Sequence, residues 1–397
     1  MRWLFIEPPD PDAVHARELK REAIARWWQA FVQQRDTILA SFRADGPEFD
    51  LPSFMHDTLH AVHPDLMWEF GPAVDKEGHR LVVTPEGESQ LRPLVDELLG
   101  AAPELPDWEF GAYRLPDLEH LSALVEGRTG QSVEGLVGRV SRGRLGTVNL
   151  EWTRLGEQPQ EPHQLFAAAF TAAEVLLGEE FLDRWVGAIK PVTDRAEAEG
   201  SGPWLAPAEL ASAARRVRRE LEQDRPEQTF AERFEHGAWT ALSLKPEPAE
   251  DYARFDDQLT GQTMALEMWE TARRGLPFCS ERFSRHGERF AALKIDVESR
   301  DGADRVANRS QLEDVLQPRL VEAGLGSITG AGLGLRYDYI DLALTDVAAA
   351  LPLIRGVLRR AEVSKRSWIL FFDSEWRDEW VGIWDDTPPP PNRDAED

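Results

Sequence analysis

The stretch that decides the fold runs over residues 66–115, where three short apolar segments flank one helical segment. It reads LMWEF at 66–70, RLVVT at 80–84, SQLRPLVDELL at 89–99 and WEFGAYRL at 108–115. The first, second and fourth segments are short and rich in aromatic or β-branched residues, which is typical of strands. The third carries leucine and valine at helical spacing and ends at Gly100. This order predicts a strand–strand–helix–strand (ββαβ) unit over 65–115.

A second ββαβ unit is expected immediately downstream, over 133–193. Its expected elements are strands at 136–141 and 147–153, an alanine-rich helix at 164–177 and a strand at 184–192. The two units together predict one α+β domain over 65–193.

The residues before the first unit are expected to be helical. Apolar side chains recur at intervals of three, four and seven between residues 11 and 44, which indicates one long helix with a buried face. A shorter helix is expected at 51–62. The predicted N-terminal helical segment therefore covers 1–64. The apolar positions of the long helix are Leu19, Ala23, Trp27, Phe31, Ile38 and Phe42.

The C-terminal part is expected to form a second α+β domain. A linker and a charged helix are predicted over 194–236, and strands alternate with helices over 237–384. The alternation predicts helices packed on one face of a largely antiparallel sheet, with a ferredoxin-like arrangement. The tail at 385–397, which contains four consecutive prolines, is expected to be disordered. The strands are predicted at 239–244, 290–297, 335–344, 368–372 and 380–384, and the helices at 251–273, 311–323 and 347–361.

Composition excludes several classes of protein. The chain has 397 residues and a formal net charge of −26, so general binding of nucleic acid is not expected. No apolar run approaches the 18 residues of a transmembrane helix, and the N-terminal residues do not resemble a signal peptide. The one cysteine, Cys279, excludes an internal disulfide and predicts the reduced environment of a bacterial cytoplasm.

Three histidines provide the strongest candidate for a metal site. His56, His60 and His63 are spaced so that they share one face of the helix expected at 51–62. Neutral imidazoles in this arrangement suit a divalent transition metal such as zinc, iron or copper, with a carboxylate from Asp57 or Glu69 as a further ligand. The structural alternative is a helix-terminal group that satisfies the last carbonyls, because Pro64 follows directly.

Two further segments have a chemical interpretation beside a structural one. Cys279 and His286 could form a thiol–imidazole pair, but no known nucleophile signature surrounds them, and a semi-buried cysteine is favoured. The glycine-rich stretch 326–334 could cradle a phosphate. It follows an expected helix and enters a strand, however, so a flexible crossover or a bulged strand start is favoured.

The stretch 51–110 concentrates the negative charge. It contains twelve acidic and three basic residues. One interpretation is a docking face for a basic protein, since complementary charge steers association. The other is an ordinary solvated surface.

The N-terminal 115 residues also resemble a known group of proteins. The resemblance lies in Trp27-Trp28-Gln29-Ala30-Phe31, in His63-Pro64-Asp65-Leu66 with Trp68-Glu69-Phe70, and in Ala102-Pro103-Glu104-Leu105-Pro106-Asp107-Trp108. These motifs are similar to those of uncharacterised bacterial proteins, some of which are encoded beside toxin and immunity genes. The resemblance implies a bacterial cytoplasmic α+β protein and assigns no functional residue.

These observations favour a non-enzymatic, acidic protein-binding module, of the immunity or regulatory kind, with a protein partner that is basic. No catalytic residue and no bound cofactor are predicted for it, nor any nucleic-acid or membrane partner. The alternative is a metal-dependent enzyme that uses His56, His60 and His63. A structural protein whose sheets form oligomeric edges is a third hypothesis.

Overall fold

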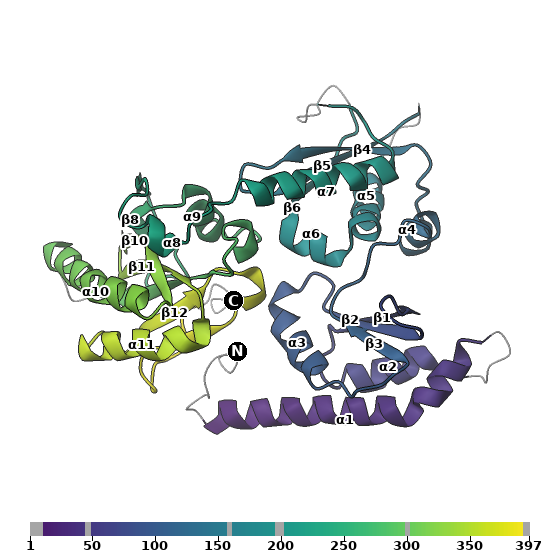
Figure 1. Cartoon of the computed structure of the whole chain (residues 1–397), viewed down its shortest axis with the longest axis horizontal. Coiled ribbons are helices and arrows are strands. Elements are labelled where there is room, and N and C mark those ends of the chain that lie inside the picture. The colour runs from purple at the N-terminus through teal and green to yellow at the C-terminus, as the bar shows by residue number, and fades with distance from the viewer. Residues whose placement is uncertain (1–10, 44–48, 157–160, 195–201, 298–301, 392–397) are drawn as a thin grey trace. The chain divides into compact units, whose positions relative to one another are not determined.

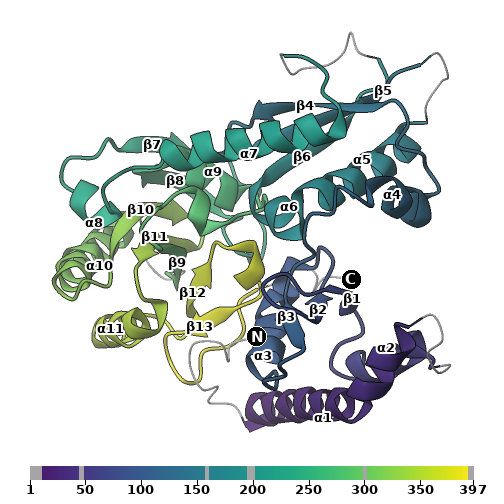
Figure 2. The same ribbon diagram turned by 45° about the vertical axis from the view of Figure 1, so that its right-hand side comes forward.

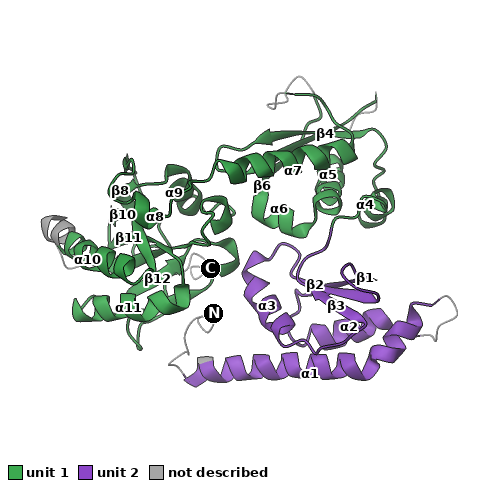
Figure 3. Ribbon diagram, viewed as in Figure 1, with its two compact units in different colours: residues 1–6, 116–397 green, residues 7–115 purple. Residues whose placement is uncertain are grey.

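The computed structural model describes residues 11–43, 49–156, 161–194, 202–297 and 302–391. These residues form an α+β protein with three β-sheets, which confirms the predicted fold class (Figure 1). The chain divides into two compact units, residues 7–115 and residues 1–6 with 116–397 (Figure 3). None of the described helices combines the length and the apolarity that crossing a membrane requires.

The unit 7–115 contains the first predicted ββαβ motif. Helices α1 (Pro11–Ser41) and α2 (Leu51–Leu59) precede strands β1 (Met67–Pro72) and β2 (His79–Thr84), a 3₁₀ turn η1 (Ser89–Leu91), helix α3 (Arg92–Gly100) and strand β3 (Trp108–Gly111). Strand β2 lies in the centre of this sheet, antiparallel to β1 and parallel to β3. A parallel pair needs a crossover connection, and α3 provides it.

The hydrophobic core of this unit joins α1 to the sheet. Trp27 and Phe31 of α1 are at most 1% exposed, and the Phe31 ring lies edge-on to Trp108 with centroids 5.0 Å apart. The compact unit therefore ends at residue 115, which differs from the boundary expected at 64/65, because the N-terminal helices and the first ββαβ motif share one core. Leu19 and Phe42, at the two ends of the expected apolar stripe, are 48% and 39% exposed.

The second ββαβ motif has the same topology as the first. Strand β5 lies in the centre, antiparallel to β4 and parallel to β6, and helices in the crossover connect β5 to β6. The expected strand at 184–192 begins two residues late, since Arg184 and Trp185 end helix α6. The elements are α4 (Leu121–Thr129), which the sequence analysis did not predict, β4 (Leu136–Arg142), β5 (Val148–Arg154), α5 (Pro162–Leu177), α6 (Glu179–Trp185) and β6 (Val186–Pro191).

The charged helix α7 (Pro207–Gln223) is part of this second motif. Its Leu210 and Ala214 are fully buried in the same core as Trp152 of β5. Gly138 of β4 allows this packing, because a Cβ atom at that position would lie 2.6 Å from Leu210 Cδ1. The region expected as linker and charged helix thus contains a helix that covers a sheet; of the linker itself, residues 195–201 lie outside the described part.

The C-terminal domain is built on an antiparallel sheet of seven strands in the order β13-β12-β9-β11-β10-β8-β7 (Figure 2). Its elements are α8 (Phe230–Arg233), β7 (Thr240–Ser243), β8 (Gln258–Thr263), α9 (Leu266–Arg273), η3 (Ser280–Arg282), β9 (Arg289–Asp296), α10 (Gly302–Glu322), β10 (Gly326–Gly334), β11 (Tyr337–Leu344), α11 (Val347–Arg360), β12 (Ser367–Phe371), η4 (Ser374–Trp376) and β13 (Trp380–Gly382).

The middle of this domain has the ferredoxin-like arrangement that the alternation predicted. The chain runs β9-α10-β10-β11-α11-β12, and these four strands lie in the spatial order β12-β9-β11-β10. Leu320 of α10 and Leu351 of α11 are fully buried against one face of the sheet, in a core with Leu293 and Leu342. The other face packs Tyr337, Trp368 and further aromatic side chains against the segment that precedes β9.

The prediction of a single helix at 251–273 is wrong. Residues 251–257 form turns, 258–263 form strand β8, and only 266–273 are helical in α9. Thr260, Gly261 and Thr263 favour helix weakly, and β8 gains backbone pairing with both β7 and β10. Pairing with the neighbouring strands β7 and β10 therefore determines the secondary structure here, although the spacing of the apolar residues suits a helix.

The described part of the tail is ordered, in contrast to the expected disorder. Asp385 accepts hydrogen bonds from Arg355 at 2.8 Å and Arg359 at 2.6 Å, and the Trp368 indole donates to the Pro388 carbonyl at 2.6 Å. Residues 392–397 of the expected tail lie outside the described residues.

Replacement of Phe31 by alanine tests the shared core of 7–115. We expect Phe31→Ala to lower the free energy of unfolding by about 3–5 kcal/mol, because the ring is fully buried and its removal leaves a cavity. Urea unfolding followed by circular dichroism measures the change. The neighbouring Val32→Ala is the control, since Val32 is 43% exposed and its loss has little effect. Equal losses in the two variants would contradict this packing.

Candidate functional site

The three predicted metal-binding histidines have separate local partners. The rings of His56 and His60 lie with centroids 4.4 Å apart, while His60 Nε2 lies 3.0 Å from the Leu66 carbonyl oxygen. The backbone N–H of Asp65 donates to His63 Nδ1 at 3.3 Å. Among the described residues, no group of three or more His, Cys, Asp or Glu side chains is arranged to hold a metal ion. The structure thus brings two of the histidines together, with no third ligand among the residues that it describes.

Glu69 and Asp57, the carboxylates considered as additional ligands, also have other partners. Glu69 lies 3.3 Å from the Arg114 guanidinium, and Asp57 lies 3.3 Å from His56 Nδ1. Burial lowers the pKa of His63, which favours its neutral form. The contact of His60 is with the Leu66 carbonyl, which lies beyond the end of α2 at Leu59, so it does not involve the last carbonyls of the helix.

Cys279 is a buried thiol with poor nucleophilic character. Burial, with a smaller contribution from the negative charge of Asp373, raises its pKa to about 12. The imidazole considered as its base, that of His286, lies 2.8 Å from the Glu227 carbonyl oxygen through Nε2. These contacts agree with the structural interpretation of Cys279.

The glycine-rich stretch 326–334 is the buried strand β10, with a register shift between Ile328 and Gly330. Its glycines allow close approach of neighbouring strands: a Cβ atom on Gly326, which has a φ of 145°, would lie 2.0 Å from the Ala343 carbonyl oxygen. The backbone of this stretch pairs with both β8 and β11. The bulged strand start is confirmed, and a phosphate cradle does not form in this strand.

Two buried charged side chains connect the turn at 251–257 to the seven-stranded sheet, on the face opposite to α10 and α11. Asp257 accepts hydrogen bonds from the backbone N–H groups of Arg336 and Tyr337, both at 2.8 Å. The fully buried Lys294 ammonium donates to the Tyr252 carbonyl and lies 4.0 Å from the centre of the Tyr337 ring. Desolvation lowers the pKa of Lys294 to about 8. Both charges hold a loop on the sheet, so we assign them a structural role.

Sequence reasoning missed these buried charges, although a signal was present. Lys294 and Asp341 lie between apolar neighbours in their strands, and a charge at such a position calls for a partner. Asp341 has one: Arg273 donates to its Oδ1 atom at 2.7 Å, and the two side chains are at most 5% exposed.

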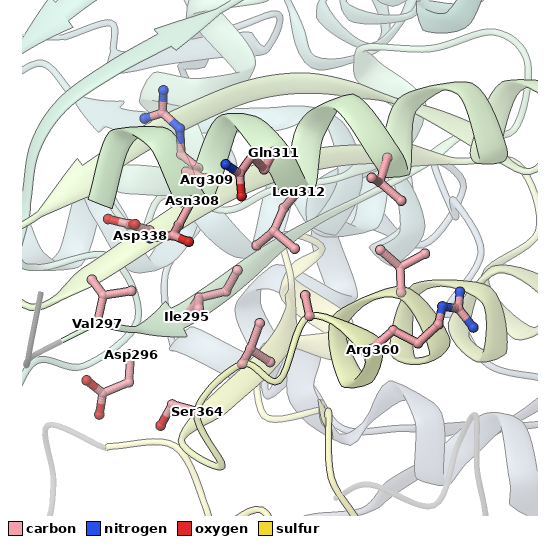
Figure 4. Close-up of a pocket in the computed structure, with 14 residues that line it drawn as sticks. Ile295, Asp296, Val297, Asn308, Arg309, Gln311, Leu312, Asp338, Arg360 and Ser364 are labelled. Carbon is pink, nitrogen blue, oxygen red and sulfur yellow. The ribbon is translucent and has the colours of Figure 1, made fainter. Parts of the chain in front are cut away.

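One pocket of the C-terminal domain lies between α10 and α11 and has a volume of about 320 Å³ (Figure 4). Apolar residues of its lining include Ile295 from β9, Val297 directly after β9 and Leu312 from α10. Arg309 at its edge is paired with Glu313 at 2.7 Å. Figure 4 shows Arg309, Asp338 and Asp296 toward one end of the pocket and Arg360 on α11 toward the other.

The unit 7–115 contains a different hollow, with a volume of about 420 Å³, which we call the acidic hollow. It is lined by Leu39, Phe42, Arg43, Glu77, Gly78, His79 and Asp107. The carboxylate residues Glu77 and Asp107 are both exposed. The Phe42 ring, 39% exposed, lies 5.1 Å from the His79 ring and 5.4 Å from the Phe70 ring, centroid to centroid.

Gly78 allows the turn that carries Glu77 to lie close to the loop that carries Asp107. The His79 N–H donates to the Asp107 carbonyl at 2.8 Å where β2 and β3 begin their parallel pairing. Gly78 has a φ of 135°, and a Cβ atom there would lie 2.3 Å from the same carbonyl oxygen. Only glycine permits this approach, so the turn before β2 and the loop before β3 lie against one another.

The hollow belongs to a strongly acidic surface. Nine of the twelve acidic residues between 51 and 110 are exposed, and Arg92, one of the three basic residues in that range, is buried. The backbone N–H groups of Val74 and Asp75 donate to Glu109 at 2.8 and 2.7 Å, and these bonds lower the pKa of that carboxyl. These bonds therefore favour the ionised form of the Glu109 carboxyl.

Comparisons with protein-family models, with curated proteins and with solved structures gave no match. The functional argument therefore rests on the side chains and their arrangement.

The reactivity of the single thiol tests the environment of Cys279. At pH 8 we expect a thiol reagent to modify the folded protein about two to three orders of magnitude more slowly than the protein unfolded in urea, because burial suppresses the thiolate. Absorbance of the released aromatic thiolate from Ellman's reagent measures both rates. The Cys279→Ser variant has no thiol and gives the background absorbance. Rapid modification of the folded protein would contradict the buried, protonated thiol.

The pH dependence of stability tests the buried ammonium of Lys294. Its pKa is lowered in the folded state, so between about pH 8 and 10.5 the unfolded state binds more protons and stability rises with pH. From pH 7.5 to 9.5 we expect wild type to gain about 2 kcal/mol relative to Lys294→Met. Urea unfolding at both pH values measures this difference. Lys245→Met, at an exposed lysine, is the control, and a pH-independent difference for Lys294→Met would refute the burial effect.

Proposed function

We propose that the chain is a non-enzymatic, acidic protein-binding module of the immunity or regulatory kind, and that it binds a basic protein in the cytoplasm. The observation that carries the proposal is the acidic hollow, where the Glu77 and Asp107 side chains line the same cavity as the exposed Phe42 ring. We place the centre of the interface at this hollow.

The hollow is lined by two acidic residues, Glu77 and Asp107, and by one arginine, Arg43. The remaining excess of negative charge suits an arginine or lysine side chain of the partner. Carboxylates form charge-assisted hydrogen bonds with a guanidinium or ammonium group, and Arg–carboxylate pairs are frequently bidentate. The Phe42 ring adds a face over which the cation or its aliphatic stem can pack. Pockets that hold one such anchor residue carry much of the binding energy of an interface.

The wider acidic surface would guide the partner to the hollow. A formal charge of −26 and the exposed carboxylates of 51–110 create an attractive potential for a basic protein. Such steering raises association rates and weakens as salt screens it. The interaction is therefore expected to be sensitive to ionic strength.

Two nucleophilic groups of the chain, the Cys279 thiol and the Lys294 amine, are buried. Burial raises the pKa of the Cys279 thiol, and Lys294 is fully buried beneath a loop. The His56 and His60 rings adjoin one another without a third ligand among the described residues, so no contact favours the metal-dependent alternative.

A pull-down from the native bacterial host tests the proposal. Immobilised protein is incubated with lysate at 50 mM and at 500 mM salt, captured proteins are identified, and the main candidate is purified for calorimetry. We expect a partner with an isoelectric point above about 8, captured at low salt and released at high salt. Glu77→Gln with Asp107→Asn should weaken the purified complex at least about tenfold, because both changes remove charge and keep shape.

The matched control removes two charges from another part of the chain. Glu209→Gln with Glu247→Gln alters exposed acids outside 51–110 and should leave the affinity nearly unchanged. If both double variants weaken the complex equally, net charge alone explains the loss of affinity, and the hollow is not a specific binding site. Failure to find any salt-sensitive protein partner would overturn the proposed function.

A further inference from the structure

Strand β7 is the last strand on one side of the seven-stranded sheet, and its outer edge is exposed (Figure 2). Ala241, Ser243 and Leu244 are exposed. Among the described strands, only β8 pairs with β7. An edge strand presents backbone N–H and C=O groups that can pair with a strand of another chain.

The hydrogen bonds between β7 and β8 indicate which backbone groups face this free edge. The Leu244 N–H donates to the Leu259 carbonyl at 2.7 Å, so the backbone of Leu244 faces β8. Successive residues of an antiparallel strand alternate between facing the neighbouring strand and facing away from it. The backbone N–H and C=O groups of Ala241 and Ser243 therefore point away from β8.

The strand at the opposite edge of the sheet, β13, has a different environment. The Ile383 N–H, directly after β13, donates to the Ser367 carbonyl at 3.1 Å. A Cβ atom on Gly382 would lie 2.6 Å from the Cβ atom of Thr387. The chain that follows β13 therefore packs against that strand.

The sequence of β7 lacks the features that usually protect a free edge. Residues 237–244 read GAWTALSL and contain no charged residue and no proline. Charged side chains and prolines are common protections of edge strands against pairing with other chains. The first such residues are Lys245 and Pro246, which follow the strand. The edge itself is thus uncharged and free of proline.

Large apolar side chains are exposed at both ends of β7. Trp239 directly precedes β7, and Leu266 follows the end of β8; since the two strands are antiparallel, both residues lie at the same end of the pair. Leu244 directly follows β7, and the Leu335 N–H donates to the carbonyl of the residue before β8, at the other end of the pair. Each of these four side chains is 37–39% exposed.

We infer that β7 is a self-association edge: two copies of the chain pair their β7 strands antiparallel about a two-fold axis, so that their sheets join into one continuous sheet. With the axis at Leu242, Ala241 of one copy lies opposite Ser243 of the other. Their outward N–H and C=O groups then form the hydrogen bonds of an antiparallel ladder.

The residues around β7 fit a second copy of the same chain. Antiparallel self-pairing brings no like charges opposite one another within the strand, because the strand has none. The two-fold axis also places the Trp239 end of one strand beside the Leu244 end of the other. Lys245 of one copy then lies opposite Trp239 of the second, where an ammonium group can pack on the indole ring. The exposed apolar side chains at the two ends are covered in the same step.

The net charge gives this association a characteristic dependence on salt. Two copies that each carry a formal charge of −26 repel one another, and salt screens the repulsion. Self-association through an uncharged edge should therefore strengthen as the ionic strength rises. The complex proposed for the acidic hollow should instead weaken, so the two interactions are distinguishable.

Sedimentation velocity of the full chain tests the inference, over a range of concentrations at 50 mM and at 500 mM salt. We expect a monomer–dimer equilibrium with the tighter dimer at 500 mM salt. Ser243→Pro should weaken dimerisation at least about tenfold, because the proline removes an outward N–H group from both strands of the pair while pairing with β8 is retained.

Ser243→Thr is the matched control, since it keeps the N–H group and should leave dimerisation nearly unchanged. Ala241→Lys keeps the N–H group as well but introduces a charge at the edge, and it should also weaken the dimer. Circular dichroism verifies that each variant is folded. A monomer at every concentration in both salts, a dimer that persists in Ser243→Pro and Ala241→Lys, or equal losses in Ser243→Pro and Ser243→Thr would each overturn the inference. Glu77→Gln with Asp107→Asn should dimerise like the wild type, so the result is independent of the proposed basic partner.

Discussion

The parallel pairing of β2 with β3 is the constraint on which the unit 7–115 depends. Parallel neighbours require a crossover, so α3 must lie between them in the sequence and cover the sheet. The same pairing places Trp108 against Phe31 of α1 and Asp107 against Gly78. The register of β2 and β3 thus determines two features of the unit. It places the Trp108 side chain in the hydrophobic core, and it places the loop before β3 beside the acidic hollow.

In the C-terminal domain, buried charged side chains hold irregular segments of chain against the sheet. Its ferredoxin-like sheet is covered by α10 and α11 on one face, while the other face is covered largely by irregular chain. Irregular segments need hydrogen-bond partners when buried, and Asp257 and Lys294 supply them from within the loop and the sheet. The ordered turn then carries Arg254 in its left-handed conformation.

Much of the fold could be predicted because periodicity is local. Both ββαβ units, helix α1 and the strands of the ferredoxin-like core have apolar patterns that match one secondary structure. The helix expected at 251–273 was wrong because apolar spacing there suits a helix, whereas pairing with β7 and β10 selects a strand. The place where the compact unit ends also escaped prediction, because a core shared by α1 and β3 involves residues some 80 positions apart.

The sequence by itself determined the class of secondary structure, the net charge of −26 and the acidic character of 51–110, since these depend on residue identity and near neighbours. Only the tertiary structure decided which side chains meet. It separated the histidines from any third ligand among the described residues and gathered Glu77, Asp107 and Phe42 into one hollow. It also placed β7 at the edge of the seven-stranded sheet. The physical reason is that side-chain proximity follows from strand register and chain crossover, which no local pattern encodes.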